Sequence, residues 1–252
     1  MKHFRCLDLV MAAFVAILIT SNVASSAKIV DLGFSLFTIP LAFDGGTLLF
    51  PFSYIFGDIL TEVYGFRASR RVIWVGFAAL VLSSSVFALL GALPADAAWE
   101  TYAGTGAYNA ILGGMSAFGL VFASILGFLA GEFSNSIVLS RMKVLMNGRF
   151  LWMRTIGSTL VGQLFDSLIF VLVACAAGVF GWELWLSLFL TNYILKTLIE
   201  VLMTPATYGA VHLLKKIEQV DVYDRGIRYN PFAFLMPGEG RLKKNPDNIN
   251  YA

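Results

Sequence analysis

Six apolar stretches divide most of this chain, and their lengths constrain its fold more than any other feature. A helix needs about 20 mainly apolar residues to cross the core of a bilayer. The stretches are residues 7–26, 47–64, 72–93, 107–131, 153–180 and 184–213. Only 13% of residues are charged, against about a quarter in soluble domains, and the mean hydropathy is +0.76. We predict an all-α membrane protein with six transmembrane helices in residues 1–217 and a polar cytoplasmic tail in residues 218–252.

Basic residues lie on alternate connections of this pattern, which sets its orientation. They gather before the first stretch and after the second, fourth and sixth, as Lys2, Arg5, Arg67, Arg70, Arg71, Arg141, Lys143, Arg149, Lys215 and Lys216. The other connections carry mainly acidic residues, such as Asp96 and Glu183. Cytoplasmic loops are enriched in lysine and arginine, so we predict that both termini are cytoplasmic. The first stretch is long for a signal peptide, and we expect it to remain as a helix.

Residues 28–46 are apolar but too short and too interrupted to cross a bilayer. Two β-rich halves flank Gly33, which favours a short hairpin or a re-entrant segment on the outer side. Irregular backbone inside a membrane requires surrounding protein or a water-filled cavity. An ordinary external loop is the alternative that these residues leave open.

Charged residues at the centres of apolar stretches indicate a polar site inside the membrane. A carboxylate such as Asp166 costs about 3 kcal/mol or more at the centre of a transmembrane helix. At about 1.5 Å per residue, Asp166 lies about 19 Å from the inner end of its helix, and Lys196 lies about 18 Å from the outer end of the next. We predict a substrate-binding group of Asp58, Gln163, Asp166, Asn192 and Lys196. A purely structural pair of Asp166 with Lys196 is the alternative.

A second polar group is expected towards the cytoplasmic ends of the helices. We predict an inner gate or ion-pair network formed by Glu62, Glu132, Asn135, Arg154 and Glu200. The alternative is that long basic side chains reach the interface and pair there without any gating role. We favour this second interpretation for Arg141 and Lys143.

The motifs give no support to several other classes of function. Two cysteines and two histidines occur, as Cys6, Cys175, His3 and His212. Their spacing provides neither a metal site nor a disulfide framework. No phosphate-binding loop, zinc-protease or serine-hydrolase motif occurs. Asp58 and Asp166 could form the aspartate pair of an intramembrane protease, but their surroundings resemble no such enzyme. We expect a protein that transports a solute, with no cofactor, no metal and no enzymatic activity.

Four segments give the chain a resemblance to a known family. They are residues 49–66 with the following Arg70 and Arg71, residues 131–144, residues 154–171 and residues 192–206. Together they resemble the queuosine precursor transporters, a bacterial and archaeal family of small membrane proteins once grouped as vitamin uptake transporters. The resemblance covers most of residues 7–220 and leaves the tail uncovered.

The resemblance implies uptake of 7-deazaguanine bases such as preQ0, preQ1 or queuine for tRNA modification, through the bacterial inner membrane. Asp166 or Asp58 would accept hydrogen bonds from N1–H and the exocyclic amine of the base, Gln163 would contact another edge, and Lys196 would donate to O6. The aromatic residues that could stack on the base are Phe52, Tyr54, Phe56, Phe165 and Phe170.

Several expectations about energy source and partners accompany this assignment. We expect a secondary or facilitative carrier. The alternative is a substrate-capturing subunit like those of energy-coupling-factor transporters, although the sequence does not indicate an ATPase partner. A homodimer is possible, and direct binding of nucleic acid is not expected.

Overall fold

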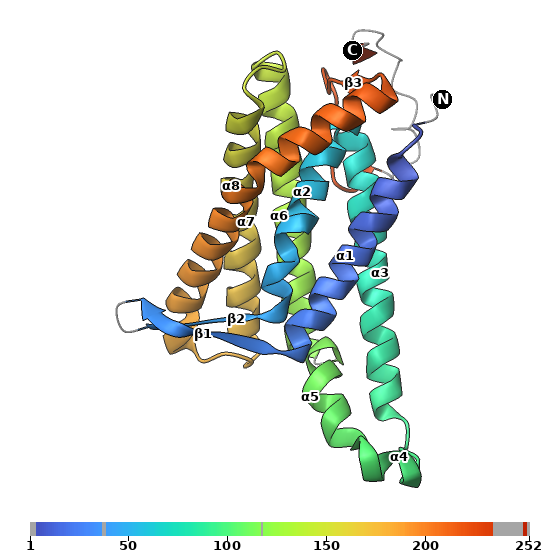
Figure 1. The fold of residues 1–252 in the computed structure, drawn as a ribbon, viewed down its shortest axis with the longest axis vertical. Helices are drawn as coiled ribbons and strands as arrows, with labels where there is room; N and C mark the ends of the chain where they lie inside the picture. The colour runs from blue at the N-terminus through green and yellow to red at the C-terminus, as the bar shows by residue number, and fades with distance from the viewer. Residues whose placement is uncertain (1–3, 37–38, 117, 234–248, 251–252) are drawn as a thin grey trace.

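The computed structural model describes residues 4–36, 39–116, 118–233 and 249–250 and shows a bundle of long helices (Figure 1). The long helices are α1 (Leu7–Ala27), α3 (Phe66–Ala92), α6 (Phe118–Leu145), α7 (Leu151–Ala176) and α8 (Trp185–Glu218). Shorter helices are η1 (Gly45–Leu48), α2 (Phe50–Ile59), the π-helix η2 (Leu60–Tyr64), α4 (Ala97–Tyr102), α5 (Gly104–Ser116) and η3 (Trp182–Leu184). The predicted all-α class is confirmed.

Two small antiparallel ladders accompany the helices. Strands β1 (Ile29–Leu36) and β2 (Ile39–Asp44) pair with each other, with Ile29 opposite Asp44 and a register shift between Asp31 and Ser35. Strand β3 (Asp221–Val222) pairs with β4 (Ile249–Asn250). Strands β1 and β2 lie within residues 28–46, for which a hairpin was one of the predictions. The location of this segment on the outer side of the membrane stays a prediction.

Four of the helices are long and apolar enough to cross a membrane: Leu7–Ala27, Phe66–Ala92, Gly119–Leu145 and Leu151–Ala176. Helix α2 has 10 residues and continues into the 5 residues of η2. Helix α8 has 34 residues and carries Lys196 and Glu200 among its apolar side chains. The chain therefore has the helices of a multi-pass membrane protein, while the count of six spans remains a prediction.

The fourth apolar stretch is divided differently from the prediction. We expected one helix over residues 107–131, but α5 ends at Ser116 and α6 continues to Leu145. Glu132 and Asn135 therefore lie near the middle of α6, and our placement of them near its cytoplasmic end is wrong. The prediction from hydropathy was wrong because the second half of this helix carries buried polar side chains. In the sequence these residues lower the hydropathy and suggest the end of a span.

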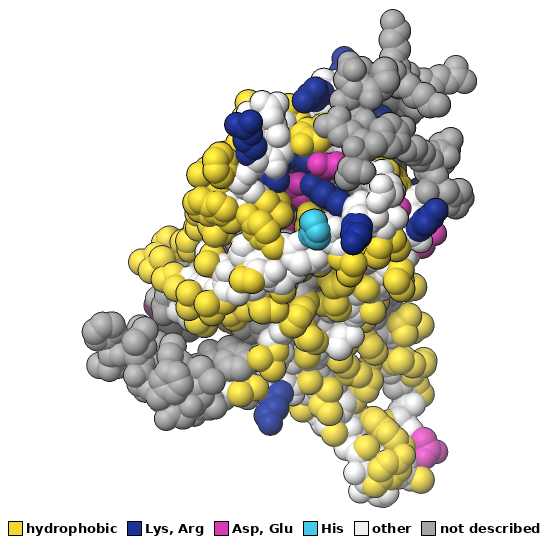
Figure 2. Space-filling model, turned by 45° about the horizontal axis from the view of Figure 1, so that its top comes forward, with side chains coloured by type: hydrophobic (Ala, Val, Ile, Leu, Met, Phe, Trp, Pro, Cys, Tyr) yellow, Lys and Arg dark blue, Asp and Glu magenta, His cyan; other side chains and the backbone are white. Residues whose placement is uncertain are grey.

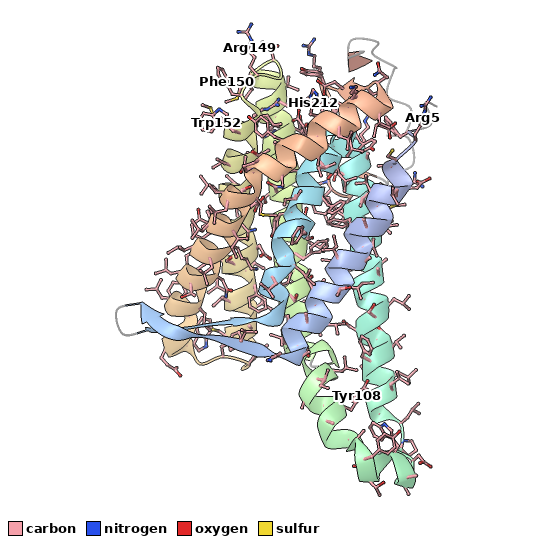
Figure 3. The ribbon with its side chains drawn as sticks, viewed as in Figure 1. Arg5, Tyr108, Arg149, Phe150, Trp152 and His212 are labelled. Carbon is pink, nitrogen blue, oxygen red and sulfur yellow. The ribbon has the colours of Figure 1, made fainter. Side chains whose placement is uncertain are left out.

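The described chain ends lie at the same end of the bundle, which we call the termini end; the end that holds α4 and α5 is the α5 end (Figure 1). Figure 3 shows Arg5, Arg149 and His212 at the termini end and Tyr108 near the α5 end. Helix α8 bends along its length (Figure 1), and Pro205 lies within it. Proline lacks the N–H that the helix ladder requires and is a frequent cause of such bends.

Glycines allow α6 and α7 to approach closely. A methyl group on Gly131 would lie 2.7 Å from Cβ of Asp166, and one on Gly162 would lie 2.9 Å from Cβ of Asn135. Small residues allow membrane helices to pack at short distance. This contact fixes Asp166 and Asn135 relative to each other, and both belong to the polar interior described below.

Candidate functional site

A cavity of about 480 Å³ lies among α1, α2, α3, α6, α7 and α8. Ser26, near the end of α1, and Leu188, near the start of α8, belong to its walls, so it extends towards the α5 end. Its charged lining residues, Glu132, Asp166 and Lys196, come from the middle of α6, α7 and α8. The cavity thus joins an apolar wall near one end of the bundle to a charged group near mid-depth.

The ion pair between Asp166 and Lys196 forms one side of this charged group. Lys196 Nζ lies 2.7 Å from Asp166 Oδ2 and 4.9 Å from the ring centre of Phe50. Asn192, one turn before Lys196 on α8, also lines the cavity. The structure thereby brings together three of the five residues predicted to bind substrate, and that role stays a prediction.

Glu132 forms another part of the cavity wall. It was predicted at the inner gate, but it is fully buried on α6 beside the cavity. Neither carboxylate oxygen has a hydrogen-bond partner within the part of the chain that the structure describes. A methyl group on Gly57 would lie 2.6 Å from Glu132 Oε2, so the glycine of α2 makes room for this carboxylate.

A layer of hydrogen-bonded polar residues lies behind the cavity wall. Asn135 donates to Asp58 Oδ1 over 2.8 Å. Thr159 and Gln163 donate to Glu200 over 2.6 and 3.2 Å. These five side chains are buried and are not among the described residues that line the cavity. Asp58 and Gln163 therefore lie behind the residues that line the cavity and not at its surface. Asn135 and Glu200, predicted for the inner gate, belong to the same layer.

Four of the five aromatic residues considered for stacking divide into two groups, and the fifth, Phe56, is partly buried and packs against the hydrophobic core. Tyr54 and Phe170, both considered for stacking, line the cavity together with Phe50, which the sequence did not single out. Phe52 and Phe165 are exposed on the outside of the bundle, where they would face lipid. The face of the helix on which each residue lies decides this division. The sequence did not show it, because the residues around all of these aromatic side chains are apolar.

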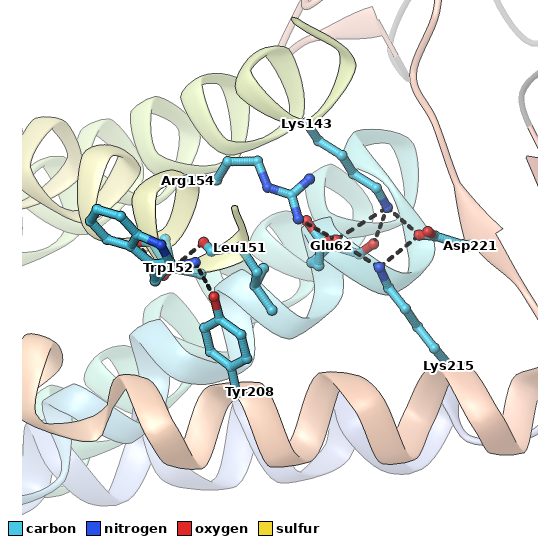
Figure 4. Close-up of polar contacts among 9 residues, drawn as sticks. Glu62, Lys143, Leu151, Trp152, Arg154, Tyr208, Lys215 and Asp221 are labelled. Carbon is cyan, nitrogen blue, oxygen red and sulfur yellow. Dashed lines mark hydrogen bonds and ion pairs between the residues drawn. The ribbon is translucent and has the colours of Figure 1, made fainter. Parts of the chain in front are cut away.

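At the termini end, a network of ion pairs joins η2, α6, α7, α8 and β3 (Figure 4). Glu62 Oε1 lies 3.1 Å from Arg154 Nη2, 2.7 Å from Lys215 Nζ and 3.5 Å from Lys143 Nζ. Asp221 Oδ1 lies 2.9 Å from Lys215 Nζ and also pairs with Lys143. We call Glu62, Lys143, Arg154, Lys215 and Asp221 the inner cluster. Two of its members, Glu62 and Arg154, were predicted for an inner gate.

Lys143 shows most clearly what the sequence interpretation missed. It was expected to reach the interface and pair there, but it is only 2% exposed. Its ammonium group donates to the backbone carbonyl of Glu62 and to Asp221. Glu62 lies in the π-helix η2, and π-helical turns often mark functional positions. The signal available in the sequence was Glu62 itself, because an acidic residue close to basic helix ends is expected to have a basic partner such as Lys143.

The segment after α8 packs onto this end of the bundle, although a polar cytoplasmic tail was expected. Asp224 Oδ2 accepts hydrogen bonds from the Phe66 backbone N–H over 2.7 Å and from Ser140 over 2.6 Å. It thus caps the start of α3 from a distant part of the sequence, as carboxylates commonly do at helix N-termini. Gly65 precedes this cap with a φ of 82°, which glycine adopts readily. Residues 234–248 lie outside the described residues, so only the first part of the predicted tail is placed.

The pKa values of the two aspartates in this segment are shifted in opposite directions. Burial raises the pKa of Asp221, but Lys143 and Lys215 outweigh it, so that the pKa lies below its usual value. Burial raises the pKa of Asp224 above its usual value, although the Phe66 N–H and Ser140 oppose the change. Asp221 therefore acts as an anion in the inner cluster.

Within the described ranges, no group of three histidine, cysteine or acidic residues could hold a metal ion.

Comparison with known proteins relates this geometry to a family. The family model described as putative vitamin uptake transporter matches residues 44–210. A probable queuosine precursor transporter of Bacillus subtilis (strain 168) is 29% identical over 175 residues, which cover 69% of this chain and 74% of the relative. The queuosine precursor transporter of Escherichia coli (strain K12) is 24% identical over 176 residues, covering 68% and 75%. A probable queuosine precursor transporter of Haemophilus influenzae is 24% identical over 180 residues, covering 69% and 72%. No solved structure matches the chain.

Proposed function

This chain belongs to the family of putative vitamin uptake transporters, and from that premise we propose that it imports 7-deazaguanine precursors of queuosine. Three relatives named as queuosine precursor transporters, or probable ones, support this substrate class. The cavity supports it as well, since its volume of about 480 Å³ lies in the range of about 300–1,000 Å³ that small-molecule sites occupy. The single observation that carries the proposal is the part-buried Asp166–Lys196 pair at the cavity wall.

The chemistry of the pair suits a 7-deazaguanine base. The base presents N1–H and an exocyclic amine side by side, and its O6 accepts a hydrogen bond. Asp166 would accept from the first two groups and Lys196 would donate to the third. Phe50, Tyr54 and Phe170 line the same cavity and would contact the faces of the base, as aromatic side chains do with nucleobases elsewhere. Asn192 would contact the base next to Lys196, while Asp58 and Gln163 would hold the layer behind.

Import through alternating access is the mechanism that we propose. The cavity extends towards the α5 end, and the inner cluster closes the termini end. Figure 2 shows lysine and arginine side chains gathered over the termini end, with acidic side chains among them. By the positive-inside rule this end would face the cytoplasm, with both termini inside the cell and the cavity open to the outside. Glu62 and Arg154 would then belong to the gate that opens to release the base.

Uptake by purified protein tests this proposal. Reconstituted vesicles should accumulate labelled preQ1, preQ0 or queuine, and the Asp166→Asn variant should lose about 10- to 100-fold of the uptake, because a hydrogen bond to a charged group contributes about 1.5–3 kcal/mol. Asp8→Asn on the exposed first turn of α1 is the matched control and should behave like the wild type. Undiminished uptake by Asp166→Asn would refute direct contact. Uptake that required an added ATPase would favour the energy-coupling-factor alternative over a self-contained carrier.

A further inference from the structure

The interior around the cavity holds an excess of buried carboxyl groups. Asp58, Glu132, Asp166 and Glu200 are 2%, 0%, 7% and 4% exposed. Among the described residues, Lys196 is the cation that pairs with any of them, and its partner is Asp166. Arg154 and the other buried cations pair with Glu62 or Asp221 at the termini end. Four ionised carboxylates and one ammonium group would leave three uncompensated negative charges inside the bundle.

Hydrogen bonds compensate two of the remaining three carboxyl groups but not the third. Asp58 accepts from Asn135, and Glu200 accepts from Thr159 and Gln163. No donor in the described part of the chain reaches either oxygen of Glu132. The charged groups that act on Glu132 from the helices packed around it are Asp58 on α2, Asp166 on α7 and Glu200 on α8, all acidic. Tyr54 of α2 also interacts with Glu132, and Gly57 of α2 lies against its carboxylate. A buried charge without partners costs several kcal/mol, and neutralisation by a proton removes most of that cost.

We propose that Glu132 is a proton-binding site that couples the import of the base to the entry of a proton. This inference rests on the proposed function. With the cavity open towards the α5 end, a proton passes from cavity water to a Glu132 oxygen and the carboxyl group becomes neutral. After the inner cluster opens, the carboxyl group returns the proton to water on the cytoplasmic side. The step moves one proton between oxygen atoms and needs no oxidant or reductant.

Infrared spectroscopy tests the proton site without any substrate. The purified wild type at neutral pH should show the carbonyl stretch of a protonated carboxyl group, and this band should lose intensity in Glu132→Gln. Glu183→Gln, which changes an exposed glutamate before α8, is the matched control and should leave the band unchanged. An identical band in the wild type and Glu132→Gln would overturn the proposal, whatever the protein transports.

Transport measurements test the coupling. With one proton carried for each base, an inward gradient of about one pH unit should raise accumulation by the wild type about tenfold over vesicles without a gradient. In Glu132→Gln this ratio should fall to about one, and Glu132→Asp, which keeps a titratable group, should restore part of it. A wild-type ratio in Glu132→Gln would contradict the coupling. If the wild type moved no 7-deazaguanine base at all, the proposed function would fail, while the infrared band would still decide whether Glu132 holds a proton.

Discussion

The cavity and the inner cluster are both built from buried charged side chains, but their charges are balanced in opposite ways. In the inner cluster, Glu62 and Asp221 face three cations, and each carboxylate contacts at least two of them. Around the cavity, Lys196 pairs with Asp166 alone among four buried carboxyl groups of the described residues, and Glu132 has no described donor. Charges that are paired with opposite charges hold helix ends together, whereas a carboxyl group with no paired cation is available for a ligand or a proton. We propose that this difference separates an end of the bundle that ion pairs hold closed from a cavity that binds the base.

Removing the shared anion of the inner cluster should produce the largest loss of stability. Glu62→Gln leaves Arg154 and Lys143 buried without their common carboxylate, and loss of one partner of a buried ion pair costs about 3–5 kcal/mol. Thermal unfolding of the purified protein should show a clearly lower Tm than Glu183→Gln. An unchanged Tm would mean that the inner cluster does not hold this end closed.

The contact between α6 and α7 should be the next most sensitive feature. In Gly131→Ala the added methyl group would lie 2.7 Å from Asp166 Cβ and 2.9 Å from the Tyr54 hydroxyl, and overpacking costs about 1–3 kcal/mol. We expect a lower Tm and weaker base uptake, because both displaced residues line the cavity. Gly106→Ala has no atom within 4 Å of the added group and serves as the control. Equal uptake by the two variants would show that the cavity tolerates a wider helix spacing.

Asp221→Asn should have a smaller effect that depends on pH. The pKa of Asp221 is lowered in the folded protein, so the carboxylate stabilises the fold above its ordinary value of about 3.9 and loses this contribution as pH falls through the lowered pKa. At neutral pH the variant should unfold at a lower Tm than the wild type, and the difference should disappear in acid. A Tm difference that did not shrink, or that grew, as pH fell below ~4 would contradict the ion pairs assigned to Asp221.

The smallest effect is expected at the edge of the inner cluster. Tyr208 on α8 accepts a hydrogen bond from the Trp152 backbone N–H over 2.6 Å (Figure 4). This contact is exposed, so Tyr208→Phe should cost about 1 kcal/mol or less. A loss comparable to that of Glu62→Gln would show that α7 and α8 are held mainly by this contact and not by the charged cluster.

The sequence predicts those features of the site that depend only on how far a residue lies along its helix. Counting residues placed Asp166 and Lys196 at similar depth, and the structure joins them over 2.7 Å. The same counting failed for Glu132, because hydropathy treats a buried polar turn as the end of a span. Helix α6 continues past it to Leu145, and depth in a bundle depends on neighbours that hydropathy does not include.

Contacts between distant parts of the chain could not be predicted from the sequence. Asp224 caps α3 through the N–H of Phe66, and Asp221 pairs with Lys143 of α6. Both aspartates lie in a polar segment without periodicity, and a polar segment that packs on a protein has the same composition as one in solvent. Lys143 itself matched the positive-inside pattern, which indicates the side of the membrane but not whether a side chain is buried.

The central claim is that the Asp166–Lys196 pair binds the base and does not only hold α7 to α8. Binding of preQ1, preQ0 and queuine to the double variant Asp166→Asn/Lys196→Gln, measured by calorimetry beside its Tm, tests it most directly, because removing both charges leaves neither member of the pair behind as an unpaired ion. We predict a folded protein with a Tm near that of the wild type and affinity lowered at least about tenfold for the base that the wild type binds. A folded double variant that bound the base as tightly as the wild type would show that the pair is structural and that the substrate site lies elsewhere.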